Sequence, residues 1–398
     1  MMVTFAPHPP LTAQFALRAL DHLQIGCLEL TLPDGGRRVL HGSRPGPRAV
    51  LEVRDWAFFR RVILSGDIGL AEAYMDGLCD TPDLVTLIEL LALNEPQLAK
   101  IANGSWWRQL GFRLAHAVRH NSRQGARRNI RAHYDLGNDF YSLWLDPTMT
   151  YSSALFDGDP SRPLEVAQRA KYARIVNRLG LRQGDSVLEI GCGWGGFAEA
   201  AARLGARVTA ITISAAQAEF ARQRLARADL AHAAKVDLCD YRDVRGAFDH
   251  IVSIEMIEAV GERHWPAYFA ALKRHLNPGG KAIVQAITIA DAFYQQYRRR
   301  ADFIQTHIFP GGMLPSPTVI ADQARRVGLS VADSFGFGGD YASTLRTWLA
   351  RFDDAVDRVK AQGFDDRFVR MWRYYLSYCA VGFATARTDV VQAEFTHA

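Results

Sequence analysis

One stretch constrains the fold of this chain more than any other, the run Ser-Val-Leu-Glu-Ile-Gly-Cys-Gly-Trp-Gly-Gly over residues 186–196. A short apolar run containing Glu189 leads into the closely spaced glycines Gly191 and Gly193, and a helical pattern follows over 197–203. The order strand, glycine turn, helix is typical of a nucleotide-binding βα unit, because glycines let the backbone approach a ligand and the helix start presents N–H groups. Glu189 then lies at the mouth of the turn, where it can accept hydrogen bonds from a ribose or an amino group.

The end of the next strand separates two classes of cofactor. Dinucleotide folds usually carry an acidic residue there to bind the ribose. In this chain the strand over 207–211 is followed instead by Thr212, Ser214 and Gln217. Hydroxyl and amide groups in place of a carboxylate argue against NAD and favour S-adenosylmethionine (SAM), whose two halves need neutral donors and acceptors.

Beyond the glycine turn, strand and helix patterns alternate, which predicts an α/β fold with a doubly wound, largely parallel sheet. The predicted strands cover 187–190, 208–211, 235–238, 250–253 and 282–286. Ligands of such sheets bind at the carboxyl ends of the strands. The residues expected there are Gly191 to Gly195, Thr212 to Ser214, Asp240 to Asp243, Glu255 to Glu258 and Gln285.

A chain of 398 residues has room for two or three domains. Residues 1–100 predict a small α+β domain, with a Pro-Asp-Gly-Gly hairpin turn at 33–36 between strand patterns. Residues 101–130 predict a basic, aromatic linker, and residues 131–398 the ligand-binding domain.

The segment 100–131 has no acidic residue, and it combines eight basic residues with Trp106, Trp107 and Phe112. This composition suits an anionic membrane surface, with rings at the headgroup level and guanidinium groups on phosphates. A solvated basic linker is the alternative. The aromatic residues of 291–398 likewise leave two interpretations open, a lid or tunnel for a long apolar substrate and a large aromatic core.

The five cysteines are scattered without metal-ligand spacing, so no metal site is predicted and free thiols in a reducing cytoplasm are expected. No apolar run is long enough to span a bilayer, and the first twenty residues lack the pattern of a signal peptide.

The chain resembles the cyclopropane-fatty-acyl-phospholipid synthases and their mycolic-acid relatives, with ordered blocks across nearly all of 127–396. A further block beginning at Gly66 extends the resemblance into the N-terminal domain. The blocks include Arg-Ala-His-Tyr-Asp-Leu-Gly-Asn-Asp from 131, Gly-Cys-Gly-Trp-Gly-Gly from 191, Glu-Met-Ile-Glu from 255, Ile-Phe-Pro-Gly-Gly from 308 and Gly-Gly-Asp-Tyr from 338.

The resemblance implies a class I SAM-dependent methyltransferase with a Rossmann-like sheet and a lid, acting on double bonds of acyl chains in membrane phospholipids. In that chemistry the alkene attacks the sulfonium methyl, a carbocation forms, and a bound bicarbonate removes a proton so that a three-membered ring closes. It also implies a cytoplasmic enzyme associated peripherally with the inner face of the membrane, no nucleic-acid partner, and a homodimer as a candidate assembly.

By matching positions, the resemblance implies catalytic and cofactor-binding residues. SAM is expected to contact Tyr151, Ser152, Glu189, Gly191, Gly193, Thr212, Ser214, Gln217, Asp240 and Tyr241. The bicarbonate site is expected to involve Glu258 and Tyr341, together with Ser153 and Gln285.

Three positions depart from the family pattern: Ser153 replaces the usual cysteine, Ala259 a histidine, and Gln285 the bicarbonate-binding histidine. Serine and glutamine still hydrogen-bond an anion, but a neutral amide cannot share a proton as imidazole does. Methyl transfer is therefore expected to survive these changes better than ring closure, and a cyclopropane, a methyl branch and a methylated alkene all stay open as products. A soluble methyl acceptor and a catalytically silent lipid-binding protein are the alternatives from other classes.

Overall fold

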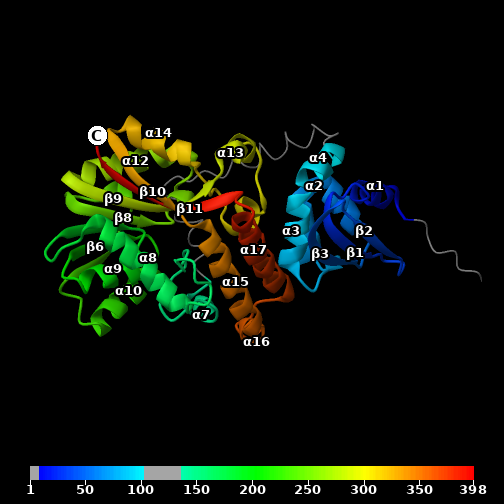
Figure 1. Cartoon of the computed structure of the whole chain (residues 1–398). Coiled ribbons are helices and arrows are strands. Elements are labelled where there is room, and N and C mark those ends of the chain that lie inside the picture. Colours follow the sequence, from blue (N-terminus) through cyan, green and yellow to red (C-terminus); the bar gives the residue numbers. More distant parts are fainter. Residues whose placement is uncertain (1–8, 103–135) are drawn as a thin grey trace, which may run out of the picture. The chain divides into compact units, whose positions relative to one another are not determined.

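The computed structural model describes residues 9–102 and 136–398, which fall into two compact units (Figure 1). The first unit holds the described residues before 103 together with Phe352–Thr385. The second holds the described residues from 136 to Arg351 together with Ala386–Ala398. The predicted basic linker lies outside the described residues except at its first two positions, and so does the start of the block from 131.

The first unit is built on a four-stranded sheet with the order β2-β1-β3-β4. Its elements are α1 (Leu11–Leu20), β1 (Ile25–Thr31), β2 (Arg37–His41), β3 (Arg44–Val53), α2 (Ala57–Met75), β4 (Cys79–Asp80), α3 (Leu84–Leu93), α4 (Glu95–Ala102), α16 (Val356–Ala361) and α17 (Asp366–Ala384). Strands β1 and β2 pair antiparallel around the Pro-Asp-Gly-Gly turn, as the sequence predicted. The described residues before 103 thus combine strands and helices, and the predicted bounds of the N-terminal domain stay a prediction.

Helix α17 belongs to this first unit, whereas its place in the sequence predicted that it would be part of the ligand-binding domain. Its Arg370 lies 4.0 Å from the centre of the Tyr74 ring of α2 and donates a 2.6 Å hydrogen bond to the Cys79 carbonyl. Trp372 and Tyr374 on the same helix are fully buried. For these aromatic residues the structure shows the core interpretation, because the helix packs its apolar face on α2 and α3.

The second unit is built on a seven-stranded sheet with the order β10-β11-β9-β8-β5-β6-β7. Its strands are β5 (Ser186–Ile190), β6 (Arg207–Thr212), β7 (Ala234–Leu238), β8 (Phe248–Ile254), β9 (Leu276–Ile289), β10 (Leu329–Gly336) and β11 (Thr388–His397). Strands β5 to β9 pair in parallel and confirm the five predicted strands. Strand β11 runs antiparallel to both β9 and β10. Strands β10 and β11 were not predicted from the sequence.

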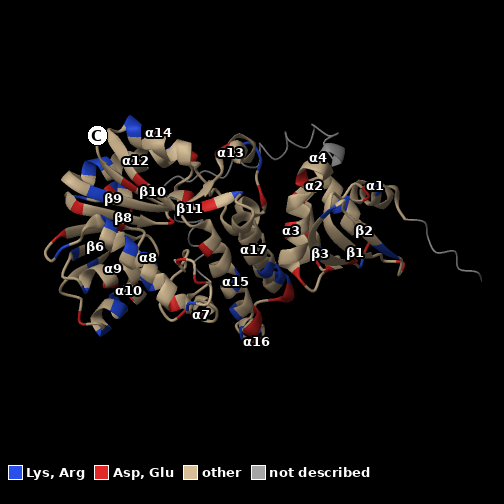
Figure 2. Cartoon of the chain, in the orientation of Figure 1, with Lys and Arg blue, Asp and Glu red and all other residues tan. Residues whose placement is uncertain are grey.

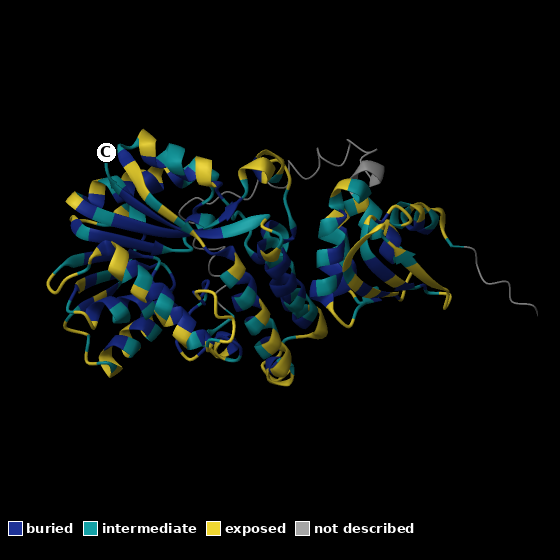
Figure 3. Cartoon of the chain, in the orientation of Figure 1, coloured by how far each residue is buried: buried dark blue, intermediate teal, exposed yellow. Residues whose placement is uncertain are grey.

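Helices cover both faces of this sheet, with α8, α9 and α10 on one face and α12 and α14 on the other (Figure 1). The helical elements are α7 (Asn138–Ser142), α8 (Leu164–Leu179), α9 (Gly196–Ala202), α10 (Ala215–Arg227), η1 (Tyr241–Asp243), α11 (Ile257–Val260), η2 (Glu262–His264), α12 (Trp265–His275), α13 (Asp291–Tyr297), η3 (Ile304–Ile308), α14 (Pro317–Arg326) and α15 (Gly338–Asp354, whose residues from Phe352 are assigned to the first unit). The central strands are buried between the layers (Figure 3). This is a doubly wound α/β architecture, as the resemblance to class I methyltransferases implied.

Charged residues of both signs are distributed over the helices and loops of the second unit (Figure 2). Within the described ranges, no helix combines the length and the apolar character needed to cross a membrane.

Candidate active site

The glycine loop after β5 contains two kinds of glycine. A Cβ atom on Gly191 would lie 2.9 Å from the Met256 side chain, and one on Gly195 would lie 3.0 Å from Ala221, so close packing and a positive φ both favour glycine at these positions. At Gly193 a Cβ would have no neighbour within 4 Å, and its φ of +51° is a conformation that glycine adopts most easily. The backbone is therefore open to a ligand at Gly193.

The end of β6 is a closed network of neutral groups, as expected for SAM. The Thr212 hydroxyl donates to Gln217 Oε1 at 3.0 Å and accepts a 3.2 Å hydrogen bond from the Ser214 N–H. Ser214 caps α10 by accepting from the Gln217 N–H at 3.3 Å. Because the oxygen of the Gln217 amide is engaged, its NH₂ group is the donor that remains for a cofactor.

Glu189 is buried at the end of β5, and burial raises the pKa of its carboxyl group to about 8. The Ala198 N–H of α9 donates to the carboxyl group, while Oε2 is buried with no hydrogen-bond partner in the described part of the chain. An unpartnered buried oxygen beside an open glycine loop fits the amino group of SAM.

Asp240 has a more structural role than the sequence suggested. Its two oxygens accept from the Arg242 guanidinium at 2.8 and 2.6 Å, and its Oδ1 also accepts from the Arg242 N–H. Tyr241 packs edge-on to Tyr268 at 5.8 Å, and burial raises the pKa of its hydroxyl to about 12. The pair organises the turn after β7, and its contact with SAM stays a prediction.

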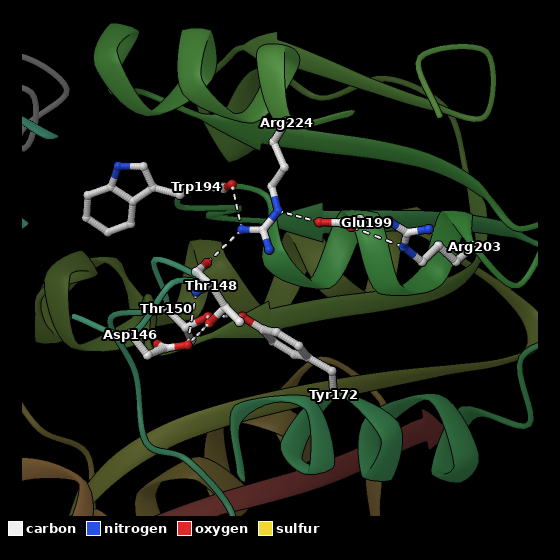
Figure 4. Close-up of polar contacts among 8 residues, drawn as sticks. All are labelled: Asp146, Thr148, Thr150, Tyr172, Trp194, Glu199, Arg203 and Arg224. Carbon is white, nitrogen blue, oxygen red and sulfur yellow. Dashed lines mark hydrogen bonds and ion pairs between the residues drawn. The ribbon is translucent and has the colours of Figure 1, made fainter. Parts of the chain in front are cut away.

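Arg224 of α10 joins the glycine loop to the segment that leads to Tyr151 (Figure 4). Its Nη1 donates to the Thr148 carbonyl at 2.7 Å and to the Trp194 carbonyl at 3.3 Å, while its Nε bonds to Glu199 of α9. One guanidinium therefore fixes two loops that are distant in the sequence, and sequence reasoning did not identify it.

Replacing Arg224 by methionine is expected to lower the free energy of unfolding by about 2 kcal/mol or more, since the Thr148 and Trp194 carbonyls each lose a charged donor. SAM affinity, measured by calorimetry, should fall with it because both loops loosen. Arg227→Met one turn later is the matched control, since among the described residues that side chain makes a single, exposed hydrogen bond of 3.4 Å to Gln223. Equal stability of the two variants would contradict this role.

Tyr151 and Ser152 lie where an aromatic cluster meets a buried lysine. The Tyr151 ring is 5.4 to 5.6 Å from those of Tyr141, Trp144 and Trp348. The Ser152 hydroxyl accepts a 2.6 Å hydrogen bond from Lys171, which is fully buried on α8. Burial lowers the pKa of Lys171 to about 7. The signal that could have identified this lysine is its place on the apolar face of α8, beside Tyr172 and Ile175.

Three of the four predicted catalytic residues meet in the structure, but they meet on Glu255 and not on Glu258. Glu255 Oε1 accepts from the Ser153 N–H at 2.9 Å and from Gln285 Nε2 at 2.8 Å. Glu255 Oε2 accepts from the Tyr341 hydroxyl at 2.7 Å. The Ser153 hydroxyl instead donates to the Ala154 carbonyl at 3.0 Å.

Glu258 lies three residues further on, in α11. Its Oε1 accepts from the Ile287 N–H, and its Oε2 is buried with no hydrogen-bond partner among the described residues. Burial, together with the negative charge of Glu255, raises the pKa of Glu258 to about 8. Glu258 is therefore mostly protonated at neutral pH, whereas Glu255 is the carboxyl group that accepts hydrogen bonds from three donors.

The residues present fit SAM but do not fit a bicarbonate. The open backbone at Gly193, the Gln217 amide and the unpartnered oxygen of Glu189 offer the contacts that SAM needs. The N–H and O–H groups assigned to bicarbonate already donate to the Glu255 carboxylate, so the expected anion site is filled by a side chain of the protein. The prediction of a bicarbonate pocket on Glu258 and Tyr341 is corrected accordingly.

Gln285 is oriented by residues whose connection with it was not expected from the sequence. Gln392 of β11 donates to Gln285 Oε1 at 3.0 Å, and Arg174 donates to Gln392 at 2.6 Å. Because its oxygen is engaged, Gln285 must direct its NH₂ group toward Glu255. Strand β11 was not predicted, so no sequence pattern indicated this chain of contacts.

Comparison with known proteins identifies the family of this chain. The family model described as "Mycolic acid cyclopropane synthetase" matches residues 121–393. The tuberculostearic acid methyltransferase UfaA1 of Mycobacterium tuberculosis is 39% identical over 98% of this chain and 93% of its own length. The cyclopropane-fatty-acyl-phospholipid synthase of Escherichia coli K12 is 37% identical over 90% of this chain and 89% of its own length.

Solved structures include the mycolic acid cyclopropane synthase CmaA1 complexed with SAH and CTAB. It has a TM-score of 0.63 and 32% identity, and the match covers 68% of this chain and 97% of that one. The chain therefore belongs to the mycolic acid cyclopropane synthetase family and is a SAM-dependent methyltransferase of the lipid cyclopropane synthase type.

Proposed function

We propose that this enzyme transfers the methyl group of SAM to a double bond in an unsaturated acyl chain of a membrane phospholipid, and that the product keeps an open chain. The observation that carries the first part is the aromatic cluster beside the glycine loop, in which the Tyr141 ring lies 5.2 Å from that of Trp194. Trp348 lies 5.4 Å from Tyr151, 5.7 Å from Trp144 and 6.1 Å from Tyr341, measured between ring centres.

Aromatic faces suit the reaction because an alkene that attacks an electrophile becomes a carbocation. SAM, when bound, supplies the electrophilic methyl. The rings stabilise positive charge through their π-faces without offering a competing nucleophile. Trp144 and Trp348 are fully buried, so they also exclude water that would quench the cation.

The second part of the proposal, an open-chain product, rests on the groups around Glu255. Gln285 is a neutral amide with both ends hydrogen-bonded, so it cannot relay a proton as an imidazole does. The relative that matches 98% of the chain is named as a tuberculostearic acid methyltransferase, which supports methylation. The Escherichia coli relative is named as a cyclopropane synthase, which makes ring closure the second candidate.

We also propose a cytoplasmic enzyme that reaches its substrate from the inner face of the membrane through the basic segment 100–131. Its arginines and tryptophans suit anionic headgroups, although the segment lies almost wholly outside the described residues.

The test is methyl transfer from labelled SAM to phospholipid vesicles that contain monounsaturated chains, with fully saturated vesicles as the control. Label is expected only in the unsaturated lipid. Mass spectrometry before and after hydrogenation then separates a methylated alkene, which takes up hydrogen, from a saturated ring. Absence of label in several unsaturated lipids would refute lipid methylation, and a cyclopropane product would refute the open chain.

A further inference from the structure

The Glu255 carboxylate is held by three donors and keeps one acceptor position. Its Oε1 takes two hydrogen bonds, from the Ser153 N–H and the Gln285 amide, while its Oε2 takes one, from the Tyr341 hydroxyl. A carboxylate offers about four lone-pair positions. The position that remains belongs to Oε2, the oxygen bonded to Tyr341, whose ring lies 6.1 Å from that of Trp348.

Each donor is itself fixed by other parts of the second unit. Gln285 is oriented by its hydrogen bond from Gln392. The segment that carries Ser153 is tied to α15, because the Ala154 N–H donates to the Thr344 hydroxyl at 3.1 Å and the Phe156 N–H donates to Asp340 at 2.7 Å. Helix α15 also carries Tyr341. The carboxylate is therefore held in one position by groups from several different elements.

The backbone at Glu255 shows that this arrangement is imposed against local preference. Its φ is +49°, in the left-handed region that residues with a side chain rarely adopt. The Glu255 N–H donates to the Gln285 carbonyl at 2.8 Å, which secures this reversal at the end of β8. Such conformations are strained and cluster at active sites, where the surrounding structure maintains them.

The surroundings also make Glu255 a stronger base than an exposed glutamate. Burial is the main cause that raises its pKa, while its hydrogen bonds and the charge of Lys171 act in the opposite direction. Glu258 adds little negative charge at neutral pH, because its own carboxyl group is largely protonated there. Glu255, which accepts from three donors, is therefore the better placed of the two carboxyl groups to act as a base.

We propose that Glu255 is the proton acceptor of this enzyme, a base built into the chain at the site where the sequence predicted a bound bicarbonate. The proposal rests on the proposed function. When the alkene has formed its new C–C bond and the C–S bond has broken, the neighbouring chain carbon is cationic. Glu255 Oε2 takes a proton from a carbon next to that cation, and the electron pair of the broken C–H bond fills it. Loss of the proton from a chain carbon gives a methylated alkene, whereas loss of a proton from the transferred methyl group would close a ring.

Glu255→Gly is the decisive variant, because glycine adopts a φ of +49° without strain. Removal of the side chain frees the Ser153, Gln285 and Tyr341 donors for an external anion. Turnover in bicarbonate-free buffer is expected to fall by about 100-fold or more, the usual contribution of a general base, with SAM affinity unchanged. Added bicarbonate or formate should restore most of the lost turnover. Wild-type turnover should be the same with and without bicarbonate.

Two further variants separate this role from a structural one. Glu255→Gln should be equally slow but should not respond to added anion, because the amide still fills the space. Asp322→Asn, in an exposed ion pair with Arg325 on α14, is the surface control and should behave as wild type. Full activity of Glu255→Gly without anion, or dependence of the wild type on bicarbonate, would overturn the proposal.

A binding measurement distinguishes failure of this inference from failure of the proposed function. Carbon-13-labelled bicarbonate, followed by NMR, should bind Glu255→Gly and not the wild type. This result does not depend on the lipid substrate, so it stands even if no phospholipid is methylated. Bicarbonate binding to the wild type, or no binding to the glycine variant, would overturn the inference whatever the substrate is.

Discussion

Replacing Gly193 by valine is expected to lower SAM affinity by about 100-fold or more, equivalent to about 3 kcal/mol. The new side chain would occupy the space in which a Cβ at this position has no neighbour within 4 Å, and a ligand needs that space to approach the loop. A β-branched residue at φ +51° also strains the turn, which would move the N–H groups on either side of it. Calorimetry with SAM measures the effect.

The control for backbone strain is Gly158→Val. Gly158 is exposed and has a φ of +79°, and a Cβ atom there would likewise have no neighbour within 4 Å, but it lies in the turn before α8 and outside the glycine loop. This variant is expected to lose stability and to keep SAM affinity. Normal SAM binding by Gly193→Val, or equal loss of binding in both variants, would contradict the assignment of Gly193 to the cofactor.

The parallel half of the sheet could be predicted because each strand combines an apolar run with a turn signal. Strands β10 and β11 could not, because β11 places Gln392 and Glu394 in a buried strand. Alternating polar residues usually indicate a solvent face. Here they are buried because Arg174 binds Gln392 and Lys281 pairs with Glu394 at 2.9 Å. Such partners come from distant segments and are not visible in a local pattern.

Partners from distant segments also explain why the candidate site could be predicted only in part. Ser153, Gln285 and Tyr341 were identified from matching positions, and in the structure they meet on one carboxylate. Their common partner Glu255 was noted only as part of a strand end. Its direction depends on a left-handed backbone conformation, which no propensity of glutamate favours. The sequence therefore indicated the donors, and only the three-dimensional structure shows the carboxylate that they hold.

The raised pKa of Glu258 gives a second large expected effect, on the pH dependence of stability. Its ordinary pKa is 4.5, and in the folded protein it is raised to about 8. Between these values the folded state keeps a proton that the unfolded state has lost, so the stabilisation that Glu258 provides falls as the pH rises. This contribution is complete below pH 4.5 and is lost by the time the pH has passed through about 8.

Glu258→Gln removes this titration, because an amide is neutral at every pH and its oxygen still accepts from the Ile287 N–H. The free energy of unfolding of the variant, relative to that of the wild type, should rise by about 2 kcal/mol or more between pH 5 and pH 8.5, since one pKa unit corresponds to about 1.4 kcal/mol. The difference between the two proteins cancels the contributions of other buried groups to the pH dependence of stability. The raised pKa of Glu189 makes stability fall with pH, as that of Glu258 does, whereas the lowered pKa of Lys171 makes it rise above pH 7. Urea unfolding at a series of pH values measures it.

Repeating the comparison in Glu255→Gly protein tests the cause of the shift. The negative charge of Glu255 is the second contribution that raises the pKa of Glu258, after burial. Without that charge Glu258 should ionise at lower pH, so the gain of Glu258→Gln between pH 5 and 8.5 should shrink but not vanish. A gain that does not change in the Glu255→Gly background would show that the two carboxyl groups do not interact. A difference that is constant across pH would show that burial does not hold the proton on Glu258.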